Sequence, residues 1–367
     1  MRMSQVKEPP FAALKPAGDG VVGKGRVRVG TLIAVPGLLQ ERGVDPAPML
    51  AEFRLEPAYF EHPDNTIAFA TEGRILARCA ELTHCPHFGL LTGQRDSASA
   101  LGAVGFLLRN SFDVRTALGE LTRHFQVHNP NATVSLIEED SFAALGYTIL
   151  QTGIEHREQI LDEATALGFN LMRELCGPNW LPTEVRFAHA RPPDLAPFRQ
   201  FFRATLRFDA NETALVFARH WLDKAPPGAD PLLHQMMAQH VRDLESLFGE
   251  DLVSQLRRLL PSLVTAHSAS RAVVAERIGL GARTLSRRLA AEGASFMQLR
   301  EEACYTLACQ FLESTHLPAK EIADLLGYAN PSAFTRAFYR WTGMGRAQWR
   351  ASRRRPFYKR SRRRGRD

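Results

Sequence analysis

Donor side chains recur at helical spacing in two stretches near the C-terminal end of this 367-residue sequence. The first stretch carries Arg283, Thr284, Ser286 and Arg287, and the second carries Ser332, Ala333, Thr335 and Arg336. Such donors can read base edges in the major groove of DNA, above all arginine against guanine. The two stretches are therefore our candidate DNA-contacting residues.

Residues 270–293, SRAVVAERIGLGARTLSRRLAAEG, have the spacing of two short helices that would present the first stretch. Leu285 and Leu289 point to one side of the second helix, which leaves the arginines on the other. Ala275 is small where the helices must cross closely, and Gly279, four residues later, can take the positive φ of a tight turn. This pattern predicts a helix-turn-helix.

The same pattern returns 48 positions later, where Ala323 and Gly327 match Ala275 and Gly279. Phe334 supplies the inward face of the second helix there. An apolar helical stretch, residues 295–314, joins the two units and would be ~27 Å long. A spacer of that length can hold two recognition helices in adjacent major grooves, ~34 Å apart. One helical hairpin occurs in many enzymes by chance, whereas two in tandem are specific for DNA binding.

The charge is distributed unevenly along the chain. The formal net charge is +7, but residues 1–261 are −5, residues 262–352 are +4 and residues 353–367 are +8. An acidic body with a basic end is typical of proteins that contact nucleic acid or a membrane surface. We expect the basic tail to contact phosphates and to add affinity without sequence information.

The composition is that of a globular protein, with 45% hydrophobic and 23% charged residues. No apolar run reaches the ~18 residues that span a bilayer, so we expect no membrane partner. The N-terminal stretch lacks the apolar segment of a secretory signal, and the five scattered cysteines suit a reducing compartment. We therefore expect a cytoplasmic protein of about two domains.

The N-terminal half predicts an α+β domain. Helices are expected at 98–109, 114–127 and 156–175, with Asp113 capping the second, and short helical patterns lie within 31–95. Alternating runs at 133–139 and 141–150 predict a β-hairpin, and short strands are expected at 184–188, 205–208 and 214–217. The expected division is a flexible leader 1–29, an α+β effector-binding and dimerisation domain 30–225, a helical linker 226–261, a double helix-turn-helix domain 262–352 and a basic tail 353–367.

These stretches resemble a known family. Residues 321–344, EIADLLGYANPSAFTRAFYRWTGM, and the sequence RTLSRRLAAEG resemble the DNA-binding domain of the AraC/XylS family of bacterial transcription regulators. The chain departs from the usual pattern at GMGRAQWR. FGLLTGQR, LGAVGFLLRNSFDVRTALGELTRHFQVHN and EVRFAHARPPDLAPFRQFF resemble the arabinose-binding-type sensor domain of one branch.

The resemblance implies sequence-specific binding to double-stranded promoter DNA by a regulator, most often an activator that contacts RNA polymerase. It also implies a small-molecule effector of unassigned identity and a homodimer. Carried over by position, Arg283, Ser286 and Arg287 would be base or phosphate contacts of the first recognition helix, and Ser332, Thr335 and Arg336 would be their counterparts in the second.

Other chemistry is less well supported. Cys79, His84, Cys85 and His87 lack the paired CxxC spacing of a structural zinc site, so we expect no metal and no cofactor. His124 and His128 are four apart on a helix, and we interpret them as a polar face. No nucleophile with a partnered base is recognisable, so we expect no enzyme. Two alternatives stay open: a DNA-binding module fused to an enzymatic or alkyl-transfer domain that uses Cys85, and a nonspecific nucleic-acid binder that uses the tail alone.

Overall fold

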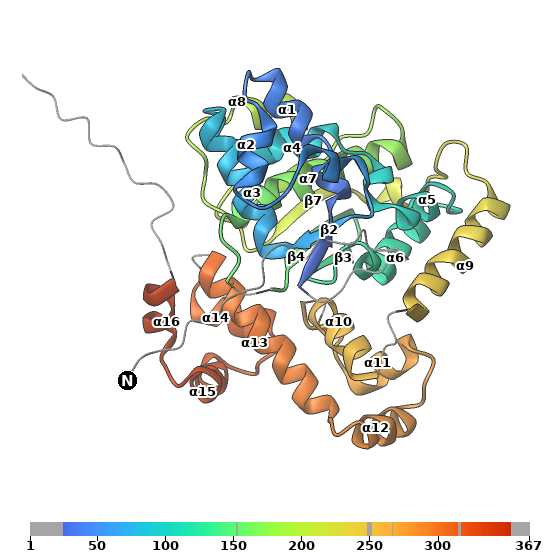
Figure 1. Cartoon of the computed structure of the whole chain (residues 1–367). Helices are drawn as coiled ribbons and strands as arrows, with labels where there is room; N and C mark the ends of the chain where they lie inside the picture. The colour runs from blue at the N-terminus through green and yellow to red at the C-terminus, as the bar shows by residue number, and fades with distance from the viewer. Residues whose placement is uncertain (1–24, 152, 248–251, 266, 315–316, 354–367) are drawn as a thin grey trace, which may run out of the picture.

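The structure is a computed structural model that describes residues 25–151, 153–247, 252–265, 267–314 and 317–353. Figure 1 shows the N-terminal part of the chain, in blue to green, above a group of C-terminal helices in orange and red. Buried apolar side chains surround a β-sheet in the N-terminal part, and a separate set lies among the C-terminal helices. The predicted order, an α+β domain followed by an all-α domain, is confirmed.

The main sheet of the described chain has five strands in the order β3-β4-β7-β5-β6. They are β3 (Ala132–Glu138), β4 (Phe142–Ile149), β5 (Glu184–Arg186), β6 (Thr205–Arg207) and β7 (Thr213–Ala218). Neighbouring strands are antiparallel except β5 and β6, which run parallel. The predicted hairpin therefore forms, and the three predicted short strands complete the same sheet.

The helices of the N-terminal domain cover this sheet and pack on one another. They are α1 (Val35–Glu41), α2 (Pro46–Ala51), α3 (Phe69–Leu82), α4 (Phe88–Arg95), α5 (Ala103–Arg109), α6 (Val114–His124), α7 (Arg157–Cys176) and α8 (Ala196–Phe202). Short 3-10 turns are η1 (Val29–Leu32), η2 (Pro57–Glu61), η3 (Ala98–Leu101), η4 (Phe125–Val127) and η5 (Arg219–Asp223). The predicted cap of α6 is confirmed, since the Asp113 carboxylate accepts a 2.7 Å hydrogen bond from the Thr116 N–H.

One local prediction was wrong, and one element was not predicted. The helix expected at 98–109 is divided into η3 and α5, because Gly102 between them has a φ of +61° that a continuous helix cannot accommodate. A second, two-stranded sheet was not predicted. It pairs β1 (Arg26–Arg28) with β2 (Thr66–Ala68), and three-residue strands are too short to show alternation in a sequence.

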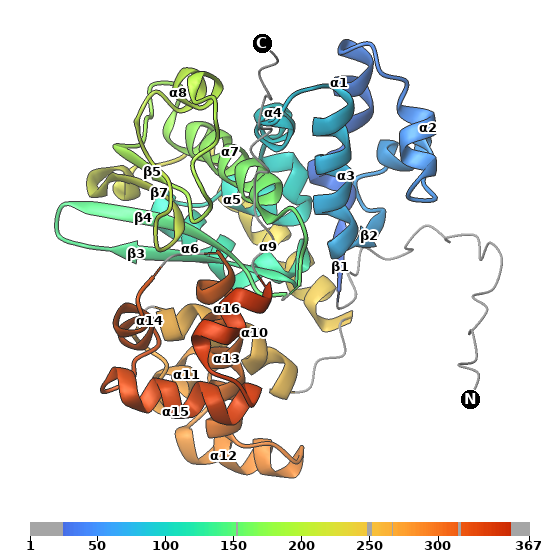
Figure 2. The same ribbon diagram turned by 90° about the vertical axis from the view of Figure 1, so that its left-hand side faces the viewer.

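Helix α7 is the central helix of the N-terminal domain. It contacts β4 and β7 of the sheet on one side and α4 on another (Figure 2). Gly89 and Gly93 of α4 face it, and a Cβ on either would overlap a carbonyl oxygen of α7, that of Gln159 or that of Glu163. The Gln159 side chain also accepts a 2.8 Å hydrogen bond from the Gly89 N–H. The close approach of α4 thus fixes the position of α7.

Two helices connect the N-terminal domain to the C-terminal helices. Helix α9 (Pro231–Leu247) buries Val241 and Leu244 in the core of the sheet domain. Helix α10 (Leu252–Thr265) buries Leu256 and Leu260 among the C-terminal helices. The helical stretch expected over 232–260 therefore consists of two helices that belong to different cores.

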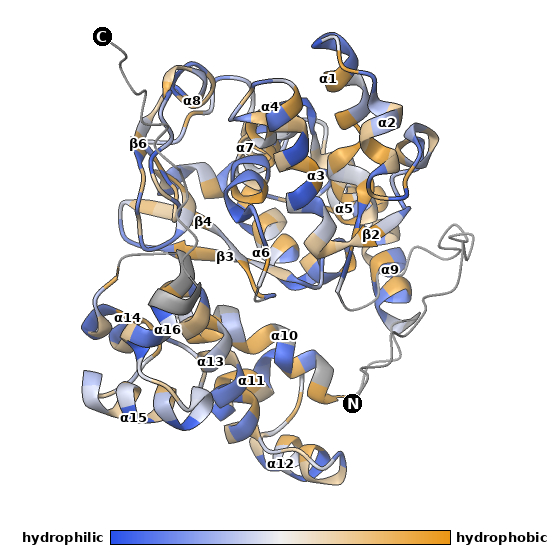
Figure 3. Ribbon diagram, turned by 60° about the vertical axis from the view of Figure 1, so that its left-hand side comes forward, coloured by the Kyte–Doolittle hydropathy of each residue, from blue (hydrophilic) through white to orange (hydrophobic). Residues whose placement is uncertain are grey.

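The C-terminal helices are α11 (Arg271–Arg277), α12 (Ala282–Ala291), α13 (Phe296–Ser314), α14 (Ala319–Leu325), α15 (Pro331–Thr342) and α16 (Arg346–Arg353). Hydrophilic and hydrophobic residues alternate along α12, as expected of an amphipathic helix that covers a core (Figure 3). Trp349 of α16 packs edge-on against Phe338, with ring centroids 5.8 Å apart. No helix within the described ranges is long and apolar enough to cross a bilayer.

Replacing Gly93 by alanine should lower the free energy of unfolding by ~1–3 kcal/mol, because the added methyl would overlap the α7 backbone. Gly119→Ala is the matched control. Gly119 lies in α6 with nothing near its missing Cβ, so alanine there should stabilise the chain by ~0.5–1 kcal/mol through helix propensity. Urea unfolding followed by circular dichroism measures both effects. Equal effects of the two substitutions would show that the α4–α7 contact tolerates a side chain.

Candidate DNA interface and buried cavity

The first predicted helix-turn-helix is formed by α11 and α12. Ala275 is buried where the helices meet, and Leu285 and Leu289 of α12 are fully buried. Gly279 takes the expected positive φ, +68°, and the N–H of Leu280 closes the turn with a 2.8 Å hydrogen bond to the Ala275 carbonyl. The turn therefore directs the outer face of α12 away from the core.

The second unit, α14 and α15, has the same turn. Gly327 has a φ of +71°, and the N–H of Tyr328 donates to the Ala323 carbonyl at 2.9 Å. The two bonds join equivalent positions 48 residues apart. Asn330 caps the start of helix α15, and its side chain accepts a 2.8 Å hydrogen bond from the Ala333 N–H. The duplication expected from the sequence is thus present in the backbone.

Helix α13 lies between the two units, with α12 at one end and α15 at the other (Figure 1). Its 19 residues give a length of ~28 Å. Leu299, Leu307 and Leu312 are buried along it, and α10 packs against it. Because core contacts hold α13 along its length, the two outer helices are carried on one rigid support.

The structure exposes the charged candidates on both recognition helices. Arg283 and Arg287 lie one turn apart on α12, and Ser332 and Arg336 lie one turn apart on α15, with all four side chains exposed. None of these three arginines pairs with a carboxylate within the part of the chain that the structure describes. Their positive charge is available to an anionic partner.

The remaining four candidates are half-buried: Thr284, Ser286, Ala333 and Thr335. The Ser286 hydroxyl donates to the Ala282 carbonyl at 3.1 Å, and the Thr335 hydroxyl donates to the Pro331 carbonyl at 2.7 Å. These two hydroxyl protons are engaged within their helices. The hydroxyl oxygens keep only acceptor capacity for a partner.

Two exposed residues of α15 were not among the candidates. Tyr339, 60% exposed, and Arg340 follow Ser332 and Arg336 on the same helix. Arg340 forms a 2.7 Å ion pair with Glu301 of α13, so its charge is partly neutralised. Tyr339 and Arg340 lie three and four residues after Arg336, a spacing that places them on the same side of a helix. That spacing could have identified both from the sequence.

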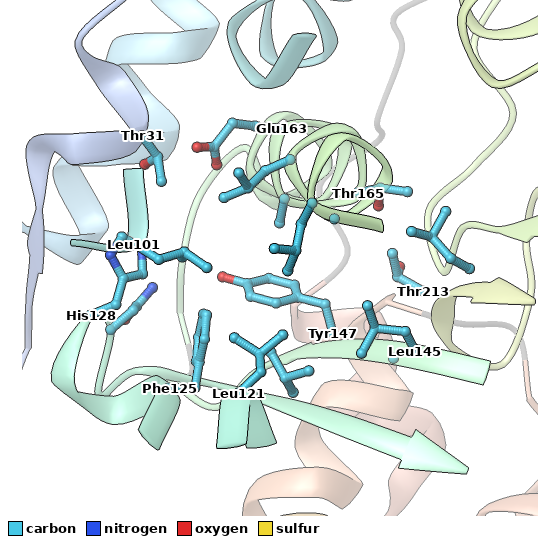
Figure 4. A pocket seen from close by; sticks show the side chains of 18 of the residues that line it. Thr31, Leu101, Leu121, Phe125, His128, Leu145, Tyr147, Glu163, Thr165 and Thr213 are labelled. Atoms are coloured by element: carbon cyan, nitrogen blue, oxygen red, sulfur yellow. The ribbon is translucent and has the colours of Figure 1, made fainter. Parts of the chain in front are cut away.

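A buried cavity of about 60 Å³ lies in the N-terminal domain between α7, the sheet and the turn η4 (Figure 4). Its walls include Leu121, Phe125, Leu145 and Leu167, which are apolar. At one end Thr31, Glu163, His128 and the hydroxyl of Tyr147 come together, and Glu72 and Asn129 also line the cavity. The cavity therefore has an apolar body and a polar end.

Burial changes the protonation of the polar end. It raises the pKa of Glu163 to about 8, and it raises the pKa of Glu72 well above the ordinary value, with a further rise from the charges of Glu163 and Asp96. Burial, assisted by the charge of Arg28, lowers the pKa of His128 to about 3. At neutral pH the imidazole is neutral and Glu163 is mostly protonated, and the pKa of Glu72 is shifted in the same direction.

The two parts of the chain match two described domains. Residues 43–225 match the "Arabinose-binding domain of AraC transcription regulator, N-term", and residues 274–352 match a "Helix-turn-helix domain". The HTH-type transcriptional regulator VirS of Mycobacterium tuberculosis is 30% identical over 331 residues, which cover 89% of this chain and 96% of VirS. The chain belongs to the AraC/XylS family of transcriptional regulators.

Other members and a solved structure are also similar. The ornithine utilization regulator of Pseudomonas aeruginosa is 25% identical, over 84% of this chain and 92% of that protein. The crystal structure of the transcriptional regulator CdpR from Pseudomonas aeruginosa aligns with a TM-score of 0.38 and 21% identity, over 72% of this chain and 86% of that one. Both relatives found by sequence are named as regulators.

In this AraC/XylS regulator, the interpretation of His124 and His128 as a polar helix face was wrong, because both side chains are buried and α6 ends at His124. Two carboxylates pair with the buried imidazole of His124. Its Nε2 lies 3.0 Å from Glu120, and its Nδ1 lies 2.7 Å from Glu245 at the C-terminal end of α9. The imidazole therefore ties α9 to α6.

Replacing His124 by glutamine should remove a pH-dependent contribution to stability. Burial lowers the pKa of His124, but hydrogen bonds and charges of Glu120 and Glu245 outweigh it and raise the pKa to about 8. The stabilisation, ~1–2 kcal/mol, is fully present below pH ~6.5 and is lost as the pH rises through ~8. Urea unfolding across this range should show a wild-type advantage over His124→Gln that shrinks with increasing pH.

The exposed His62 provides the control, since His62→Gln should leave the pH profile unchanged. A wild-type advantage over His124→Gln that is constant with pH would mean that the imidazole acts only as a neutral hydrogen-bonding group.

Proposed function

We propose that this regulator binds specific promoters with α12 and α15 in two adjacent major grooves. The observation that carries the proposal is the pair of exposed arginine-bearing helices held at the two ends of one buried helix, α13. Arg283, Arg287 and Arg336 are its base or phosphate contacts, and Thr284, Ser286, Ser332, Ala333 and Thr335 surround them. Footprinting on promoter fragments chosen by genome-wide mapping should show two protected segments about one duplex turn apart. Equal protection of random DNA would contradict it.

We propose that the N-terminal domain is the effector-sensing part. The cavity supports this, because its lining includes Phe125 and His128, which flank or belong to η4. On the other side of η4, His124 and Gln126 both bind Glu245 of α9, the latter at 2.9 Å. An effector that changes η4 would therefore act on the helix that leads to the DNA-binding helices. It switches the regulator only if it binds the two states with different affinity.

The remaining assignments follow from the resemblance and are also proposals. The regulator would act in the cytoplasm, where promoter DNA lies, as an activator that contacts RNA polymerase. The functional boundaries would be the predicted ones, 1–29, 30–225, 226–261, 262–352 and 353–367, with two changes. The sensor domain would begin at β1, because residues 26–28 pair with β2, and α9 and α10 of the predicted linker would belong to the two domains whose cores they enter. Residues 1–24 of the leader and 354–367 of the tail lie outside the described residues.

The alternative of an alkyl-transfer enzyme is not favoured by the thiol on which it depends. Cys85 is 3% exposed, and burial raises its pKa although the charge of Arg42 acts in the opposite direction. The thiolate is the nucleophilic form of cysteine, and a raised pKa keeps the thiol protonated at neutral pH.

Arg287→Ala and Arg336→Ala should each weaken binding to the cognate promoter by ~1–3 kcal/mol, because each removes a donor that reads a base edge. Fluorescence anisotropy with the cognate fragment and a scrambled fragment measures the effect. Arg191→Ala, an exposed arginine of the N-terminal domain, should change neither affinity. Equal losses on both fragments would show that the two arginines contact only phosphates.

Removal of residues 354–367 distinguishes this proposal from a nonspecific binder that uses the tail alone. We expect lower affinity and a shallower salt dependence, with the preference for the cognate fragment retained. Complete loss of binding would support the tail-only alternative.

We propose that the regulator self-associates through an apolar patch where α5 meets α9. Phe106, Phe112, Leu232 and Met236 are exposed there, Phe112 by 84%. Asn110 accepts a 3.2 Å hydrogen bond from the Asp230 N–H, which places the end of α5 beside the start of α9. Large exposed apolar patches mark interaction sites in soluble proteins.

The double substitution Phe112→Ser and Met236→Ser should lower the mass measured by sedimentation equilibrium from that of a dimer to that of a monomer. Met297→Ser, which removes an equally exposed methionine from the DNA-binding part, should leave the dimer intact. A wild-type protein that sediments as a monomer would refute the patch as a dimer interface.

A further inference from the structure

The polar end of the cavity holds polar atoms without partners. Glu72 Oε2, Glu163 Oε1 and His128 Nδ1 are buried and have no hydrogen-bond partner among the described residues. The three side chains are each at least 97% buried and line the same cavity. Leaving such atoms unpaired costs ~1–3 kcal/mol each, and more for a charged group, so their arrangement calls for a partner.

All three atoms can accept a hydrogen bond. Glu72 and Glu163 hydrogen-bond each other, and the free oxygen of each accepts once that carboxyl group is ionised. A neutral imidazole accepts at the nitrogen that carries no proton. His128 stays neutral at physiological pH because burial holds its pKa near 3. A group that satisfies the polar end therefore has to donate several hydrogen bonds.

The groups at this end that can become charged at neutral pH are acids, because His128 stays neutral. No cationic side chain of the described chain offsets the charge of Glu72 or Glu163, whose surroundings include a third acid, Asp96. Arg28 is near His128, but its guanidinium forms an ion pair with Asp64. Arg157 lowers the pKa of Tyr147, and it too has a partner of its own. A positive charge is the complement that this end lacks.

We propose that the cavity binds the ammonium group of a small primary amine, with Glu72, Glu163 and His128 accepting its three hydrogen bonds and the apolar walls enclosing its carbon chain. The proposal rests on the proposed effector-sensing function and names the chemical class of the effector. In Figure 4 the Tyr147 ring lies between the two ends, so that its hydroxyl faces the polar end and its ring faces the apolar walls.

The size and chemistry of the cavity exclude other classes. A cavity of about 60 Å³ is far below the ~300–1,000 Å³ typical of drug-sized ligands, which excludes nucleotides and oligosaccharides. An alcohol offers one donor for three acceptors. A bound carboxylate would be unfavourable, because its charge would raise the pKa of Glu72 and Glu163 further and no described cation offsets it.

Binding has to release protons. Burial raises the pKa of Glu163 to about 8 and that of Glu72 above its ordinary value in the free protein, and a bound ammonium favours their ionised forms. Each carboxyl that ionises releases one proton to the solvent, while the ammonium keeps its own. Affinity should therefore increase by about tenfold per pH unit for each proton released, up to the pKa of Glu163 near 8.

The full-length protein tests this with n-butylammonium chloride as the probe, and with n-butanol, sodium butyrate and sodium chloride as matched additions. Thermal unfolding should show stabilisation by n-butylammonium at concentrations up to about 50 mM, because a ligand of ~five non-hydrogen atoms binds weakly. Calorimetry in two buffers of different ionisation enthalpy should detect proton release.

Glu72→Gln combined with Glu163→Gln keeps the size of both side chains and removes their charge. This variant should bind n-butylammonium at least ~tenfold more weakly, and its binding should lose the pH dependence. Glu139→Gln, which alters an exposed carboxylate outside the cavity, is the control and should bind as the wild type does.

Several outcomes would overturn the proposal. Equal stabilisation by n-butanol would show an apolar cavity without charge recognition, and stronger stabilisation by butyrate would show an anion site. Binding without proton release would show that the amine does not interact with the two carboxyl groups. This measurement uses the wild-type protein, so it holds even if the double variant fails to fold. If the protein protects its promoter in footprinting but does not bind n-butylammonium, the amine proposal alone is refuted. Absence of a preferred promoter instead contradicts the proposed function.

Discussion

Two recognition helices read a duplex together only if their separation matches its helical repeat, and the buried helix α13 sets that separation. Its apolar side chains lie in the same core as Leu285 of α12 and Phe334 of α15. The turns at Gly279 and Gly327 then orient each outer helix from a fixed point. Because a packed core deforms little, the spacing of the two arginine faces is a property of the fold and not of the DNA.

The same core reaches toward the sensor through α10, which packs on α13 and contacts β3. Helix α9 precedes it in the chain but belongs to the other core, where its end is held by His124 and Gln126. Neighbouring helices in sequence are thus anchored in separate domains. A change in the position of α9 relative to α10 would alter how the DNA-binding helices sit, and η4 is the element that lies between the cavity and α9.

The sequence predicted the DNA-binding helices well because their signals are local. A buried alanine four residues before a glycine of positive φ, followed by leucine or phenylalanine at i and i+4, specifies a helix-turn-helix without distant contacts. The hairpin was predictable for the same reason. The pair β1 and β2 was not, since residues 26–28 and 66–68 meet only after the chain between them has folded.

The cavity could not be predicted because burial of an acid depends on what packs over it. Glu163 lies three residues after Ile160 and four before Leu167, so it interrupts an apolar helical stripe, and Glu72 stands in the same relation to Phe69 and Leu76. That interruption was the available signal. It shows that a charge faces the core, but not that two such charges from α3 and α7 meet at one cavity.

Two buried acids weaken the folded sensor domain, because burial opposes their ionisation and no described cation offsets it. A protein selected only for stability would replace them by apolar side chains of similar size. Their retention makes sense where a ligand supplies the missing charge, since a group that binds the folded form alone stabilises it by mass action. A ligand that stabilises one conformation of the domain more than another shifts the balance between them. It would then also shift the helix that leads to the DNA-binding core.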